Sequence, residues 1–297
     1  MGTRPLAPRD YAVPVAWWGW SWEPPVPMSV TQLLAAGNMD ARTAALCWLV
    51  LEAHGSILIA ADPPHSGKTT TLTAFLDLVP SSVRRVYLRG GSETLDYADQ
   101  CAPDETLLLA NELSSHLPVY LWGARAVAVF RTLRDGFALA ATMHADTPYD
   151  AIAQLRDELG VPADDLARID LLVVMRVDGA AQGVARRVAS VHRLRMPGPH
   201  VVALVERDAT SGAWRHDDAA QLELVGSMPA LEERAAYLAR LVDQRVFGIE
   251  EVRAALAAHR TSAIDAAERP NLTSDRSSAK RRSPVTNDRP STSGART

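Results

Sequence analysis

Residues 56–73 read SILIAADPPHSGKTTTLT, an apolar run followed by a polar loop and then by the start of a helical apolar pattern. The loop closes on Ser66-Gly67-Lys68-Thr69-Thr70. A phosphate-binding P-loop requires this order of strand, loop, Gly-Lys-Thr and helix, because backbone N–H groups and the helix N-terminus then face the phosphates. We expect these five residues to bind nucleotide phosphates, with the Lys68 ammonium as a point charge and the Thr69 hydroxyl as a ligand of Mg²⁺.

The first half of this loop departs from the P-loop pattern. Asp62 stands where the first glycine is usual, and Pro64 and His65 occupy positions where smaller residues are common. A carboxylate beside the phosphates weakens their binding, since like charges repel in a poorly solvated site. A carboxylate that points outward has no such effect, and the sequence leaves both orientations open for Asp62.

The composition is that of an ordinary globular protein. The chain has 297 residues, 47% hydrophobic and 22% charged, enough for one large domain or a core domain with small appendages. A net charge of −4 argues against a general nucleic-acid binder. Cys47 and Cys101 lie far apart and have no metal-ligand spacing, so neither a metal site nor a disulfide framework is expected. There is neither a signal peptide nor an apolar run of about 18 residues, and we expect a cytoplasmic location.

Three segments differ in character. Residues 1–28 form an irregular arm rich in proline and tryptophan, whose aromatic side chains either pin the arm onto the domain or form a docking patch for another subunit or a membrane-side partner. Residues 29–260 carry alternating helix and strand patterns, beginning with a short helix and a longer one capped by Asn38 or Asp40. Residues 261–297 lack an apolar period and are predicted to be a disordered tail.

Polar side chains follow three predicted strands. Lys68 follows the P-loop strand, Glu112 follows an apolar run at 106–110, and His144 follows another at 137–143. Because the carboxyl ends of parallel strands meet at one edge of an open α/β sheet, we expect these three side chains to lie together. An acid in the position of Glu112 can orient water or bind Mg²⁺ through its hydration shell.

The remaining patterns complete an α/β fold. Further strands are predicted at 83–88, 169–177, 186–194 and 201–207. Further helices are predicted at 122–134, from a Thr147 N-cap onward, at 231–246 and at 249–259. The expected fold class is a mainly parallel sheet with a small C-terminal β-hairpin and a helical region.

Together these segments resemble the type II and type IV secretion and type IV pilus assembly ATPase superfamily (secretion ATPase E-like), over residues 29–259. The likeness consists of a Walker A loop, an acidic Asp box, a Walker B strand, a His box and a hairpin, which resemble in turn residues 62–70, 88–93, 106–112, 136–146 and 173–188. The His box, GFALAATMHAD, is the most specific match, because Thr-x-His-Ala between a strand and a helix is distinctive.

This resemblance implies a RecA-like P-loop NTPase core that binds ATP and Mg²⁺. It implies a hexameric ring that couples ATP hydrolysis to secretion or pilus machinery at the inner membrane, in the cytoplasm or peripheral to the membrane. By resemblance, Glu112 and Glu93 would position the attacking water, and His144 would sense the state of the nucleotide. Arginines from a neighbouring subunit often complete such sites; the candidates are Arg125, Arg131 and Arg134.

The sequence also departs from this family. It lacks the first P-loop glycine, has Arg89-Gly90 in place of paired acids in the Asp box, and has Ser114-Ser115 where an arginine–aspartate pair is common. Only the arm and the first helices precede the P-loop. Losing one such element can lower a rate by orders of magnitude. A catalytically weak or inactive nucleotide-binding scaffold therefore remains an alternative, and a DNA-handling ATPase is a weaker one because the net charge is acidic.

Overall fold

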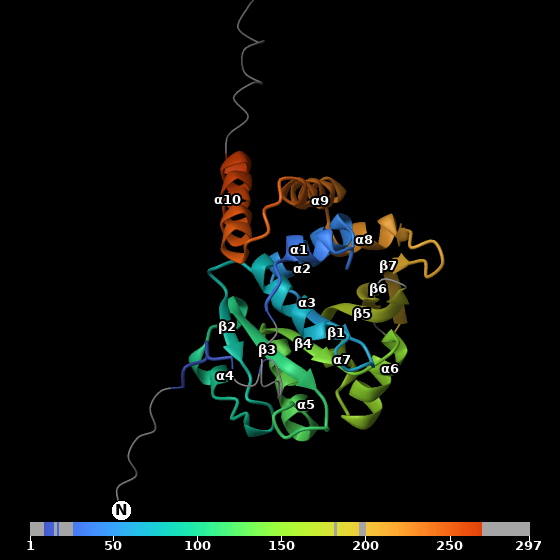
Figure 1. Cartoon of the computed structure of the whole chain (residues 1–297). Coiled ribbons are helices and arrows are strands. Elements are labelled where there is room, and N and C mark those ends of the chain that lie inside the picture. Colours follow the sequence, from blue (N-terminus) through green and yellow to red (C-terminus); the bar gives the residue numbers. More distant parts are fainter. Residues whose placement is uncertain (1–8, 15–16, 18–25, 181–182, 196–199, 269–297) are drawn as a thin grey trace, which may run out of the picture. The chain divides into compact units, whose positions relative to one another are not determined.

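The computed structural model describes residues 9–14, 17, 26–180, 183–195 and 200–268. The chain divides into two compact units, Met1–Ala257 and Ala258–Thr297, and the fold and the site below belong to the first (Figure 1). Among the described residues we find no helix with the length and apolar character needed to span a bilayer.

The centre of the first unit is a β-sheet. Within the described ranges it has eight strands in the order β2-β3-β4-β1-β5-β6-β7-β8. The strands are β1 (Ser56–Ala60), β2 (Arg84–Tyr87), β3 (Thr106–Leu113), β4 (Ala138–Met143), β5 (Ile169–Ala180), β6 (Gly183–Arg195), β7 (His200–Arg207) and β8 (Trp214–His216).

Strand direction divides the sheet into two parts. The pairs from β2 to β5 are parallel, with Ile57 of β1 opposite Ala140 of β4 and Leu171 of β5. From β5 onward the pairs are antiparallel. β4 lies between the P-loop strand β1 and the Glu112 strand β3. The expected fold class is therefore confirmed, although the C-terminal hairpin is longer than predicted and continues the main sheet.

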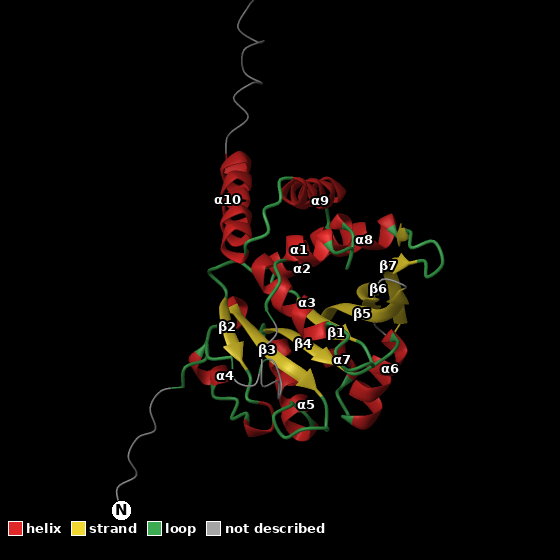
Figure 2. Cartoon of the chain, viewed as in Figure 1, coloured by secondary structure: helices red, strands yellow, loops and turns green. Residues whose placement is uncertain are grey.

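Helices cover both faces of the sheet (Figures 1 and 2). One face carries α1, α2, α3, α8 and α9, whose apolar residues share one core cluster, and the other carries α4 to α7, which share a second cluster. The helices are α1 (Val30–Ala35), α2 (Ala41–Glu52), α3 (Lys68–Phe75), α4 (Tyr97–Gln100), α5 (Gly123–Thr132), α6 (Pro148–Ala153), α7 (Ala163–Leu166), α8 (Asp218–Val225), α9 (Met228–Asp243) and α10 (Ile249–Glu268).

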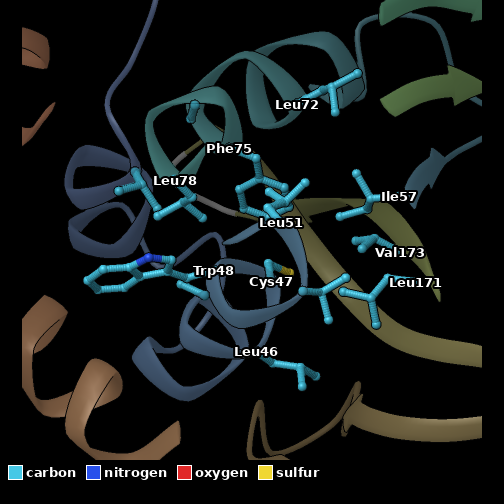
Figure 3. Packing of buried hydrophobic residues seen from close by; sticks show 14 of the residues in the cluster. Leu46, Cys47, Trp48, Leu51, Ile57, Leu72, Phe75, Leu78, Leu171 and Val173 are labelled. Carbon is cyan, nitrogen blue, oxygen red and sulfur yellow. The ribbon is translucent and has the colours of Figure 1, made fainter. Parts of the chain in front are cut away.

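β1 is buried over its whole length because it has helices on both sides. Ile57 and Ile59 face the α2 and α3 layer, whereas Leu58 and Ala60 face the opposite layer. Figure 3 shows Ile57 beside Phe75, Leu51 and Val173 in the first of these clusters. A strand buried on both faces requires an unbroken apolar run, and the sequence has one here.

Cys47 lies in the same cluster, within α2 (Figure 3). Its thiol is free and fully buried, and this burial raises its pKa to about 12. Cys101 is also free and buried. Cys47 is therefore a core residue, and its thiol is poorly reactive because the thiolate is the reactive form.

Most element boundaries agree with the sequence patterns. Of the two candidate caps for α2 the structure uses Asp40, whose side chain accepts the N–H of Thr43. Thr147 caps α6 as predicted, by accepting the N–H of Asp150. The predicted helix after the P-loop ends earlier than its apolar pattern, at Phe75, and continues as a 3₁₀ turn.

Other boundaries differ from the predictions. β3 extends to Leu113, so Glu112 lies within the strand and does not follow it. α10 continues to Glu268, beyond the point at residue 261 where the tail was predicted to begin, while residues 269–297 lie outside the described part. Three helices, α4, α7 and α8, were not expected from the sequence. α4 and α7 are only four residues long, too short for a periodic signal.

Part of the N-terminal arm packs on this domain. Trp17 is buried, its indole N–H donates to the Thr73 hydroxyl at 2.9 Å, and its ring meets that of Tyr87 edge-on. Trp17 thus pins the arm, which is one of the two interpretations of its aromatic residues. Trp18, Trp20 and Trp22 lie outside the described residues.

The shared core predicts a large cost for truncating a central side chain. Phe75→Ala should lower the free energy of unfolding by about 3–5 kcal/mol, because it removes a fully buried ring between α3 and the sheet. Urea denaturation followed by circular dichroism measures this change. Leu222→Ala, at a half-exposed position on α8, is the control and should change stability by less than about 0.5 kcal/mol. Equal effects of the two variants would contradict this packing.

Candidate functional site

The P-loop lies between β1 and α3. Gly67 stands directly before α3 with φ of 91°, a left-handed conformation that favours glycine. A Cβ atom at Gly67 would also come within 3.1 Å of the Arg186 side chain. No side chain caps α3, so the N–H groups of its first turn are left for another acceptor. This end of the helix can therefore hold an anion.

Lys68 is a buried cation. It is 6% exposed, and its ammonium donates to the backbone carbonyl of Ala61 at 2.9 Å. Burial lowers its pKa, while the negative charges of Glu112 and Asp62 act in the opposite direction. A neutral carbonyl offsets only part of the cost of burying an ammonium charge. An oxyanion bound in the cavity that Lys68 lines would therefore stabilise this charge.

Three residues of the loop with hydroxyl groups, Ser66, Thr69 and Thr70, line one cavity together with Lys68. The Ser66 hydroxyl is buried and has no hydrogen-bond partner among the described residues. Thr69 and Thr70 are half-buried, and both line the same cavity as Lys68. A buried hydroxyl without a partner costs free energy, and an oxygen-rich ligand would offset this cost.

Glu112 and His144 form a pair opposite the loop. Glu112 Oε1 lies 3.1 Å from His144 Nε2, and His144 Nδ1 lies 2.8 Å from the backbone carbonyl oxygen of Asp62. A carbonyl oxygen only accepts, so Nδ1 carries a proton. The contact with the Glu112 carboxylate raises the His144 pKa, although burial and the Lys68 charge oppose this. Adjacent strand ends and the P-loop thus meet at one point, as predicted.

Asp62 contributes its backbone to this arrangement. Its side chain is exposed and does not line the cavity, while its carbonyl oxygen orients the His144 ring. Of the two orientations that the sequence left open, the structure has the outward one. Asp62, which stands where a P-loop usually has its first glycine, therefore brings a carboxylate near Lys68. This carboxylate is not among the groups that line the cavity.

One cavity of about 940 Å³ unites most of the predicted residues. Its lining includes residues 64–71, Asn111, Glu112 and His144, together with side chains from α1, the loop after it, and β6. The five phosphate-binding candidates, Glu112 and His144 are thus brought together. A cavity of this size is in the range of small-molecule sites.

Glu93 lies outside this group. It is buried, does not line the cavity, and receives two hydrogen bonds from the Arg9 guanidinium, at 2.7 and 2.9 Å. It also accepts the backbone N–H groups of Arg89, Thr94 and Leu95. Burial alone raises its pKa, but the bonds from Arg9 and these N–H groups outweigh burial and lower it. Both oxygens therefore anchor the N-terminal arm.

The candidate arginines are also distant from the cavity. Arg125 donates to the backbone carbonyl of Glu93, and Arg134 pairs with Asp165. Arg131 is exposed on α5. None of the three lines the cavity, so within this chain they have no contact with the P-loop site.

Arg186 lines the cavity, and the sequence analysis did not single it out for the site. It lies on β6, where its Nε–H donates to the His65 carbonyl at 2.5 Å and so holds the P-loop from the side. Asn38 fixes this strand with two bonds: its side-chain amide donates to the Arg186 carbonyl at 2.9 Å, and its backbone carbonyl accepts the Val188 N–H at 2.8 Å. The alternation of side chains along a strand shows on which face of the sheet Arg186 lies. It does not show that Arg186 contacts a loop that stands 121 residues earlier in the sequence.

No family model matches the sequence. The chain is 26% identical over 249 residues to the uncharacterized protein MJ0900 of Methanocaldococcus jannaschii, covering 77% of this chain and 45% of the relative. It is 24% identical over 208 residues to the uncharacterized protein MJ1287 of the same organism, covering 63% of this chain and 76% of the relative. The chain thus spans less than half the length of the first of these relatives.

Solved structures of secretion ATPases show partial likeness. The VirB11 ATPase of the Brucella suis type IV secretion system, in complex with sulphate, is 18% identical with a TM-score of 0.38, over 54% of this chain and 53% of that one. The DotB ATPases of Yersinia pseudotuberculosis and Legionella pneumophila are 12% and 13% identical, each with a TM-score of 0.39, over 74% of this chain and 56% and 58% of theirs.

The contacts of Glu93 predict that its removal affects stability. Glu93→Gln should lower the free energy of unfolding by about 1–3 kcal/mol, because it removes the fully buried one of the two carboxylates that pair with the Arg9 guanidinium and leaves only Asp96. Denaturant unfolding measures this, with Glu105→Gln, at an exposed acid before β3, as the control. Unchanged stability together with a loss of ATP hydrolysis would instead support a catalytic role for Glu93.

Proposed function

We propose that this chain binds ATP with Mg²⁺ at the P-loop and hydrolyses it. The observation that supports this most is the grouping, in one cavity, of the buried Lys68 ammonium, the uncapped start of α3 and the Glu112–His144 pair. The Lys68 cation, the free N–H groups of α3 and the Ser66 hydroxyl are groups that bind a polyphosphate. The Glu112 carboxylate opposite them is a group that can position a water molecule.

Binding and charge stabilisation would come from the loop. Lys68 and the N–H groups at the start of α3 would hold the β- and γ-phosphates, with Ser66, Gly67 and Thr70 completing the cradle. The Thr69 hydroxyl would hold Mg²⁺, which neutralises charge on the phosphate oxygens when bound. Arg186, from the same chain, lies where it can contribute a further positive charge.

Water positioning would come from the opposite side of the cavity. Phosphoryl transfer requires an in-line water, and a carboxylate such as that of Glu112 can accept its hydrogen bond. His144 holds this carboxylate, and its own orientation depends on the Asp62 carbonyl. Because Asp62 belongs to the P-loop, a shift of the loop on nucleotide binding would be transmitted to Glu112 through His144.

A nucleotide-binding subunit without turnover is the second candidate. The altered first half of the loop, at Asp62, Pro64 and His65, supports it, and so does the pairing of Glu112 with His144, which occupies the carboxylate. In this case Lys68 and Thr69 would still bind nucleotide, and the bound state would regulate or scaffold a partner ATPase.

Two variants separate these functions. Lys68→Ala should weaken ATP binding by about 10- to 100-fold, because hydrogen bonds to charged groups contribute about 1.5–3 kcal/mol. Glu112→Gln should retain binding and lower hydrolysis by about 10²- to 10³-fold, because it removes a charge that acts mainly in the transition state. Calorimetric titration with Mg²⁺-ATP and a phosphate-release assay measure the two quantities.

Two control variants test whether the effects of Lys68→Ala and Glu112→Gln are specific to these positions. Lys280→Ala removes a lysine from the C-terminal segment, and Glu105→Gln removes an exposed acid before the same strand as Glu112. Both should behave as wild type. Binding without turnover in the wild type would favour the regulatory subunit, whereas hydrolysis that persists in Lys68→Ala would contradict both functions.

We further propose, on the motif resemblance, that the chain assembles as a homo-oligomeric ring of six subunits. Secretion or pilus machinery at the inner membrane would be its partner, in the cytoplasm or at the membrane surface, and no specific nucleic acid is expected. Arginines on the outside of this chain, such as Arg131, would then be available to a neighbouring site. Light scattering coupled to size-exclusion chromatography, with and without Mg²⁺-ATP, tests the ring; a monomer under both conditions would exclude it.

A further inference from the structure

A third titratable side chain lies beside Glu112 and His144. His116, in the loop after β3, is exposed, and its ring meets the His144 ring edge-on with centroids 5.5 Å apart. Its backbone N–H donates to the Ser114 hydroxyl at 3.1 Å, which helps to hold the start of the loop. One ligand atom from each of the three residues lies within 4.8 Å of the others. In the part of the chain that the structure describes, this is the one group of three with that geometry.

The orientation of His144 is that of a metal ligand. Its Nδ1–H donates to the Asp62 carbonyl, so the remaining nitrogen, Nε2, faces Glu112 Oε1 at 3.1 Å. Metal-bound histidines generally donate their other ring N–H to a carbonyl or carboxylate in this way. Two ligand atoms at about 2.0–2.1 Å from a tetrahedral metal lie about 3.3 Å from one another, close to the observed separation.

The donor set selects the class of metal. Two imidazoles and one carboxylate suit Zn²⁺ and similar transition metals, in a site with an open position. Mg²⁺ prefers oxygen ligands, so it is not the ion that these residues favour. We propose that Glu112, His116 and His144 bind a divalent transition metal of the Zn²⁺ class, at a site distinct from the Mg²⁺ position at Thr69.

This site would compete with the proposed chemistry of the cavity. The metal would occupy the Glu112 carboxylate and His144 Nε2, which the proposed function assigns to water positioning. The Lys68 charge opposes a second cation nearby, but its ammonium donates to the Ala61 carbonyl and His144 is the residue paired with Glu112, so a metal would bind between two side chains that already face one another. The proposal does not rest on nucleotide hydrolysis.

The test is a Zn²⁺ titration of the nucleotide-free, full-length protein against a chromophoric chelator. The wild type should bind Zn²⁺, and Co²⁺ in its place should give visible absorption with intensity typical of a four- or five-coordinate ion. His116→Ala should weaken binding at least about tenfold, since even loss of an outer-shell partner of a metal site costs 10- to 100-fold. Circular dichroism and thermal unfolding confirm that the variant folds.

A histidine outside the group provides the control, because the chain has 8 histidines and surface sites bind Zn²⁺ weakly. His200→Ala, at an exposed position at the start of β7, should bind as the wild type does. Equal affinities of the His116 and His200 variants, or no Zn²⁺ binding by the wild type, would overturn the proposal. Zn²⁺ binding that His116→Ala weakens, in a protein that fails to bind ATP, would support the metal site while removing the proposed function.

Discussion

Burial of β1 on both faces is the constraint on which the rest of this structure depends. A strand with helices on each side cannot solvate its own backbone, so its hydrogen bonds must go to β4 and β5. That pairing sets the register of the neighbouring strands and places their carboxyl ends in one row. The loops that follow these strands therefore begin at one edge of the sheet. At this edge the P-loop follows β1 and leads through Gly67 into α3.

The site is then assembled by short polar contacts between segments that the sheet has already brought together. The backbone carbonyl of Asp62 holds the His144 ring, the ring faces Glu112, and Arg186 holds the His65 carbonyl from β6. Two of these contacts use backbone carbonyls of the altered half of the P-loop. The residues that depart from the usual pattern are therefore integrated into the site through their backbone, whatever their side chains contribute.

The N-terminal arm uses a different type of interaction. Arg9 enters a pocket formed by Glu93, Asp96 and the Tyr87 carbonyl, and Trp17 packs where α3 meets β2. An acid in a segment that resembles a catalytic box thus serves to attach a distant part of the chain. Glu112 and His144 lie with Lys68 at one cavity, as the predicted strand ends indicate, because their positions follow from the strand order, whereas the partner of Glu93 does not.

The sequence by itself determined most of the longer elements and the edge of the sheet at which the strands end. Apolar runs, the Gly-Lys-Thr step and the Thr147 cap are local signals, and a parallel sheet converts them into a shared site at Lys68, Glu112 and His144. Tertiary structure alone decided the pairing of Arg9 with Glu93, the approach of Arg186 to the P-loop and the outward direction of the Asp62 carboxylate. These contacts join residues 84 and 121 positions apart, or depend on a backbone carbonyl, which any residue presents. Short-range patterns contain no information about such contacts, because they form only after the sheet has packed.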